Sequence, residues 1–268
     1  MAAATTAGQT SALAQAGAAM RLQARFLRRN PHDLLPILTM PLTGMMSLLV
    51  FAAAGRTDLY GHALVAALCM TIGQMTFFVG SEILASDRDS LVLEALLASP
   101  ARYPLVVYAR MLVLVGAGAA LALCLGAAIL LPVAGRLPAI HHPASFGAAL
   151  ALTLLAASGT GMLTVALFAL GRTARTFQNS ISGPLYLLGG VLVPAAYLPE
   201  ALQPLSRLVF LSWSADLLRD ALQPAPIRDQ GLRLAALLLL GAAGMLGGSL
   251  ALARMLRIAR SRGALAFS

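Results

Sequence analysis

Residues 111–135 read MLVLVGAGAALALCLGAAILLPVAG, and this stretch between Arg110 and Arg136 carries no charged side chain. Its 25 residues exceed the roughly 20 that a helix needs to cross the hydrocarbon core of a membrane. The rest of the chain has the same character, since it is 59% hydrophobic and 11% charged, whereas a soluble domain is typically about 25% charged. The composition therefore predicts an all-α integral membrane protein.

Five further runs without Asp, Glu or Arg flank this one along the chain. Together the six runs predict six transmembrane helices, at about 33–55, 62–84, 105–133, 146–170, 177–196 and 233–255, within a membrane domain of residues 31–256. A seventh apolar run, LVFLSWSA between Arg207 and Asp216, has only 8 residues and is too short to cross. We expect it to form a short helix that dips into the membrane or lies at its surface.

The segments outside the spans are short. Residues 1–10 predict a disordered tail, and residues 257–268 a cytoplasmic tail. Residues 11–30 predict an amphipathic helix for the inner membrane surface, with its basic face toward anionic lipid or a partner protein. A solvated basic face is the simpler alternative. Four arginines fall in one arc of about 100° on this helix: Arg21, Arg25, Arg28 and Arg29.

The distribution of arginine predicts the orientation. An even number of spans puts both termini on one side, and placing that side in the cytoplasm puts 13 of the 19 basic residues there. Cytoplasmic loops of membrane proteins collect basic residues. The same bias accounts for the net charge of +9 without nucleic acid as a partner.

All 19 basic residues are arginine, so the chain has no lysine. A P-loop needs a lysine to hold phosphates, and therefore any ATP and Mg²⁺ that the function requires must be bound by another chain. No zinc-protease motif or paired-carboxylate site lies in the predicted spans. We expect no catalytic residue, no metal site and no cofactor on this chain.

The stretch SDRDSLVLEALLASP, residues 86–100, predicts a cytoplasmic helix between spans two and three. Ser86 or Asp87 can cap its N-terminus, and acidic residues suit the first turn. Leucines at i, i+3 and i+4 form an apolar stripe, and Pro100 ends the helix. The stripe needs a membrane surface or a partner subunit to cover it.

This stretch resembles the coupling segment of the ABC-2 type permeases, whose pattern is roughly E-R-E-x-G-T-L-E-x-L-L-x-S-P. The chain reads D-R-D-S-L-V-L-E-A-L-L-A-S-P, with Leu91-Val92 where Gly-Thr is usual. The resemblance implies that these residues couple the permease to an ATPase: Asp87, Arg88, Asp89, Leu93, Glu94, Leu96 and Leu97.

A second segment, residues 183–222, is similar to the same family. It contains L-P-x-x-L-Q-P-L at 198–205, followed by A-x-D-x-x-R at 214–219 in the family's order, with Ser214 at the alanine position. The resemblance implies a helical hairpin that re-enters the membrane from outside between spans five and six. Asp216 and Arg219 can pair within it at i, i+3 spacing. The hairpin residues are Pro199, Pro204, Trp213, Asp216 and Arg219.

The resemblance implies a complex in a bacterial inner membrane, with both termini of this multi-pass chain in the cytoplasm. A second permease, either a copy or a paralogue, completes the path, and two ATPase subunits dock below. Family members similar to the daunorubicin-type permeases export drug-like molecules or lipids, and others export lipid-linked glycans.

Few polar side chains lie within the predicted spans. Gln74 and Glu82 are candidates for the transport path, although helix-to-helix hydrogen bonds for Gln74 and snorkelling for Glu82 explain them equally well. Glu82 can also pair with Arg110 or Arg102. The scarcity of buried charge favours an amphipathic or apolar substrate and an external energy source. An ion-coupled carrier and a membrane-anchored structural or immunity-type protein are the alternatives. Gly244 and Gly248 form a GxxxG pattern that predicts close helix packing.

Overall fold

The computed structural model describes residues 12–29, 59–79, 102–135, 137–168, 183–191 and 197–261, together with Ile83 and isolated positions between 39 and 55. Within these ranges every regular element is a helix. In chain order the elements are α1 (Ala12–Arg29), α3 (Tyr60–Gln74), the π-helix η2 (Met75–Val79), α6 (Tyr103–Ala134), α7 (Pro143–Phe168), α9 (Gln203–Ser206), α10 (Phe210–Ala221) and α11 (Gln230–Ser261).

Three of these helices are long and apolar enough to cross a membrane. Among the described residues they cover Tyr103–Pro132, Pro143–Leu167 and Gln230–Met255, in the predicted third, fourth and sixth spans. The rod formed by α3 and η2 lies in the second predicted span. The first predicted span falls mostly outside the described residues. An integral membrane fold agrees with these helices, while the number of six spans stays a prediction.

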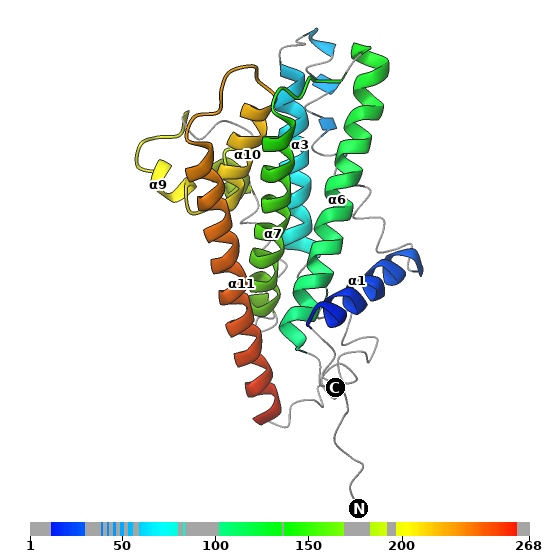
Figure 1. Cartoon of the computed structure of the whole chain (residues 1–268), viewed down its shortest axis with the longest axis vertical. Coiled ribbons are helices and arrows are strands. Elements are labelled where there is room, and N and C mark those ends of the chain that lie inside the picture. Colours follow the sequence, from blue (N-terminus) through cyan, green and yellow to red (C-terminus); the bar gives the residue numbers. More distant parts are fainter. Residues whose placement is uncertain are drawn as a thin grey trace, which may run out of the picture.

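Four rods run along the long axis of the molecule (Figure 1). Figure 1 shows α3, α6, α7 and α11 side by side, with α1 lying obliquely across α6 at the end where α11 finishes. The α9–α10 hairpin lies in the opposite half of the bundle, against α7, α11 and α3. The chain thus has an α1 end and a hairpin end.

Glycines bring α7 and α11 into close contact. A Cβ on Gly244 would lie 2.9 Å from the backbone nitrogen of Thr160, and one on Gly248 would lie 2.8 Å from the nitrogen of Leu163. A Cβ on Gly159 of α7 would lie 2.7 Å from the carbonyl oxygen of Gly241. These backbones approach so closely because no side chain separates them. The close packing predicted from the GxxxG pattern is confirmed.

In the described part of the predicted fifth span, the helix ends at residue 188. The sequence predicts the end of this span at about residue 196. Residues 183–188 are helical, and Gly190 then adopts a left-handed φ of +62°. The backbone N–H of Val191 donates to Tyr186 O at 3.1 Å, and that of Gly190 donates to Leu187 O at 3.1 Å. This pair of bonds is a Schellman cap, which ends a helix.

Candidate functional site

At the α1 end, the amphipathic helix packs on the start of α6 through small side chains. Ala19 of α1 is buried together with Val106 and Ala109 of α6, and Ala16 and Met20 pack beside them. The packed face therefore follows the i, i+3, i+4 spacing of a helix. Leu13, in the first turn of α1, lies outside this contact and is 85% exposed.

Two glutamines extend this packed face at either side of the alanines. The Gln23 Oε1 accepts a hydrogen bond of 2.7 Å from the Arg110 Nε, and these side chains are only 5% and 3% exposed. The Gln15 Oε1 accepts one of 3.3 Å from the backbone N–H of Arg102. Buried polar groups are expensive unless they are paired. Hence the buried Gln23–Arg110 bond fixes α1 on the second turn of α6.

Sequence reasoning missed both glutamines. It considered Glu82 as the partner of Arg110, and Glu82 lies outside the described residues. The available signal was the spacing of Gln15, Ala19 and Gln23, which share one helical face with a buried alanine at its centre.

The basic side chains of α1 lie away from the packed face. Arg21 and Arg25 are exposed, and Arg28 and Arg29 belong to the last turn of α1, where the side chains are not described. The helix is therefore amphipathic, as the sequence predicts, with its apolar side against α6. The contact of the basic side with anionic lipid or with a partner protein stays a prediction.

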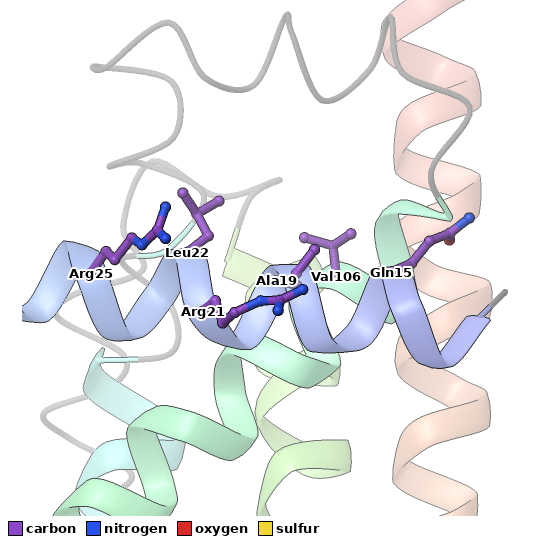
Figure 2. A pocket seen from close by; sticks show the side chains of 7 residues that line it. Gln15, Ala19, Arg21, Leu22, Arg25 and Val106 are labelled. Atoms are coloured by element: carbon purple, nitrogen blue, oxygen red, sulfur yellow. The ribbon is translucent and has the colours of Figure 1, made fainter. Parts of the chain in front are cut away.

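A groove of about 520 Å³ opens beside α1. Figure 2 shows Leu22 and Arg25 projecting from the same side of the helix, while the Arg21 side chain runs along it toward Ala19. The described residues that line the groove are Gln15, Ala18, Ala19, Arg21, Leu22, Arg25 and Val106.

The predicted coupling residues, Asp87 to Leu97, lie outside the described residues, so their role stays a prediction. The helices that flank them are described. The rod of α3 and η2 runs toward the α1 end and finishes at Val79, and α6 begins at the α1 end with Tyr103 (Figure 1).

The α3 rod continues into a π-helix, η2. The Thr76 side chain donates to Ile72 O at 2.8 Å, while the Thr76 carbonyl accepts a bond of 3.3 Å from the Thr164 hydroxyl of α7. A π-helix leaves backbone groups that a neighbouring hydroxyl can satisfy, and such turns are frequent at functional sites. Gln74 precedes this turn and is half-buried, and its role in the path stays a prediction.

At the other end, the predicted hairpin residues come together around α10. Pro199 accepts a backbone bond of 2.8 Å from Leu202, and Pro204 lies in the first turn of α9. Trp213 donates its indole N–H to Arg207 O at 2.8 Å, and the Arg207 guanidinium lies 4.7 Å from the centre of the Trp213 ring. These contacts fold α9 back on α10.

The charged residues of the hairpin have different partners from those that the i, i+3 spacing suggested. Asp216 pairs with Arg207 at 3.0 Å, nine residues earlier rather than three later. Asp220 pairs with Arg233 and so joins α10 to α11. Thr153 of α7 donates to the Ser214 hydroxyl at 2.9 Å. The short helix is thus tied to both α7 and α11.

Arg219 of α10 is 6% exposed and points at the Schellman cap. Its Nη1 donates to Gly190 O at 2.7 Å, and its Nη2 donates to Val191 O. A guanidinium suits the end of a helix because the last carbonyls are unpaired and the helix dipole is negative there. Arg219 therefore connects α10 to the end of the 183–188 helix.

Comparison with known families identifies the chain. The family model described as ABC-2 type transporter matches residues 16–222, from the second turn of α1 to the end of α10. A search of curated proteins gives no match.

Proposed function

The chain belongs to the ABC-2 type transporter family, and on this premise we propose that it is the permease subunit of an ATP-driven exporter. In this proposal a second copy or a paralogue completes the path, and two separate ATPase subunits bind ATP and Mg²⁺. The family match carries the proposal. The absence of lysine supports the separate ATPase, because a P-loop on this chain would need one.

We orient the α1 end toward the cytoplasm of a bacterial inner membrane, with both termini on that side. Exposed arginines support this choice, since Arg21 and Arg25 on α1 lie at the end where Arg254 and Arg257 finish α11. The connection that holds the coupling segment follows η2 and enters α6 at the same end.

In this orientation the coupling segment faces the ATPase. Its stripe of Leu93, Leu96 and Leu97 would insert into a groove of that subunit, with Glu94 beside the stripe. Movement of the ATPase would then reach both α3 and α6, because the segment joins them. Movement would also reach α1, which is bonded to α6 at Gln23 and Arg110.

The spanning helices favour an apolar or amphipathic substrate, either a drug-like molecule or a lipid. The three described helices of spanning length contain no carboxylate. Ion-coupled carriers usually keep such groups inside the membrane as proton or ion ligands. An external energy source fits these helices better. A lipid-linked glycan is the alternative substrate.

A co-purification experiment with the ATPase tests this function. The chain is co-expressed with a candidate P-loop ATPase, to be sought in the neighbouring reading frames, and binding and substrate export are measured for Glu94→Arg. We expect both to fall at least about tenfold, because an arginine would replace a carboxylate next to the leucine stripe that the proposal inserts into the ATPase groove. Glu200→Arg is the matched control, with the same charge change on an exposed residue at the hairpin end. Normal export by Glu94→Arg would contradict the coupling role.

The energy source is measured separately. Export by the wild-type complex should stop when ATP is depleted and continue when an uncoupler removes the proton gradient. Export that survives ATP depletion but not the uncoupler would identify an ion-coupled carrier instead.

A further inference from the structure

We propose that the groove beside α1 binds the headgroup of an acidic phospholipid. This inference rests on the proposed function only in placing α1 at the inner membrane surface. It adds a defined ligand site to a helix that the sequence assigns to the interface in general terms.

The charge of the groove comes from Arg21 and Arg25, which line it together. Residues four apart on a helix are neighbours, with Cβ atoms about 5–6 Å from each other, so two guanidinium groups can reach one phosphate. Arginine is well suited to such contacts because its planar fork can donate two parallel hydrogen bonds.

No acidic residue lines the groove within the described part of the chain. Neither Arg21 nor Arg25 makes an ion pair with a described residue. Within the described residues the positive charge of the groove is therefore uncompensated, and a ligand with net negative charge complements it. A zwitterionic phospholipid would offset that attraction with its own ammonium group.

Apart from Gln15, the rest of the described lining is apolar. Ala18, Ala19 and Leu22 of α1 and Val106 of α6 lie beside the arginines, and Leu22 is 39% exposed. Such a surface can contact the glycerol backbone and the first methylenes of an acyl chain. A lipid has both a phosphate for the arginine donors and apolar groups that can pack against Leu22 and Val106. A free phosphate has no apolar group to pack there, so the groove matches a lipid better.

The position of α1 agrees with this ligand. The helix lies obliquely across α6 rather than along the bundle (Figure 1), as an interfacial helix does. Its contacts with α6 through Ala19 and Gln23 hold it there without using the arginines. Figure 2 shows that Arg25 and Leu22 project together, which puts a cationic and an apolar group on the same side.

Native mass spectrometry of the full-length chain in detergent tests the site without any ATPase. We expect phosphatidylglycerol to form a discrete one-to-one adduct and phosphatidylcholine to bind at least about tenfold more weakly. Arg21→Gln with Arg25→Gln should weaken the phosphatidylglycerol adduct about tenfold or more, since each basic residue near an anionic surface contributes about fivefold. The matched control is Arg254→Gln with Arg257→Gln, which removes two exposed arginines of α11 outside the groove and should leave the adduct unchanged.

Three results would overturn the proposal. Equal losses in the two double variants would show diffuse attraction to basic residues, and equal binding of phosphatidylcholine would show that charge plays no part. Displacement of the lipid by millimolar inorganic phosphate or glycerol 3-phosphate would assign the groove to a soluble phosphate.

A protein ligand would give a different pattern. If the α1 double variant loses the ATPase in the co-purification experiment while its lipid adduct is unchanged, the groove is a protein-docking site and the lipid assignment fails. Failure of the lipid site alone leaves the permease function standing, because the adduct is measured on the isolated chain.

Discussion

The two ends of the bundle are held together in different ways. At the hairpin end, α10 bonds to three neighbours: Arg219 reaches the 183–188 helix, Ser214 bonds to α7 and Asp220 to α11. At the α1 end, one helix rests on α6 through alanines and two glutamine bonds. The comparison indicates a hairpin fixed to the bundle by several neighbours and an α1 that, among the described helices, packs mainly on α6.

The largest expected effect is at Arg219. Replacing it by methionine leaves the carbonyls of Gly190 and Val191 without their donors in a buried place, which should lower the free energy of unfolding by about 3 kcal/mol. The change is measured by heating the protein in detergent and using size-exclusion chromatography to determine the fraction that stays folded at each temperature. Arg219→Lys should be intermediate, because one ammonium cannot reproduce the two-pronged contact.

Arg228→Met is the control for this experiment, since Arg228 is an exposed arginine near the same end. A loss as large as that of Arg219→Met would mean that positive charge, rather than the contact with the Schellman cap, stabilises the hairpin.

A smaller and more local effect is expected at Gln23. Gln23→Leu removes the acceptor of the buried Arg110 Nε and should cost about 1–2 kcal/mol. Because α1 contacts mainly α6, we expect α1 to detach while the bundle stays folded. Limited trypsin digestion should therefore cut at Arg21 and Arg25 several-fold faster, with little change in the melting temperature.

Gln15→Leu is the matched control, because Gln15 makes the longer and exposed bond to Arg102. It should leave the digestion rate nearly unchanged. A large drop in the melting temperature of Gln23→Leu would show that α1 is as integral to the fold as α10.

The smallest effect is expected at Arg207. Its ion pair with Asp216 and its contact with the Trp213 ring are partly exposed, and such interactions contribute about 0.5–1 kcal/mol. Trp213 is the single tryptophan of the chain, so the fluorescence of the protein reports on the surroundings of this side chain. Arg207→Gln should shift the emission of Trp213 and barely change the melting temperature, whereas an unchanged emission would show that the contact is not formed.

Much of the helical layout could be predicted from the sequence, because charge-free runs and glycine spacing are local patterns. The runs around residues 105–133, 146–170 and 233–255 each correspond to a helix of spanning length. The GxxxG pattern of Gly244 and Gly248 correctly indicated a close helix contact. These features depend only on the composition of one segment.

Partners across the fold were harder to predict. Arg219 bonds to carbonyls 28 and 29 residues earlier in the chain, and a backbone oxygen has no residue type that could have revealed it. Gln23 was overlooked because a glutamine on an amphipathic helix is usually solvated. The early end of the 183–188 helix did have a signal, since Gly189-Gly190 precedes Pro194, and glycine followed by proline is typical of a helix C-terminus.

The π-helix η2 changes how the rod of Tyr60–Val79 can be drawn on a helical wheel. A π-turn takes up one residue more than an α-turn, so each π-turn shifts the angular phase by about 100°. A wheel continued from Tyr60–Gln74 at α-helical periodicity therefore assigns the wrong azimuth to residues of Met75–Val79. The face that carries Gln74 does not continue along η2 at the spacing of an α-helix.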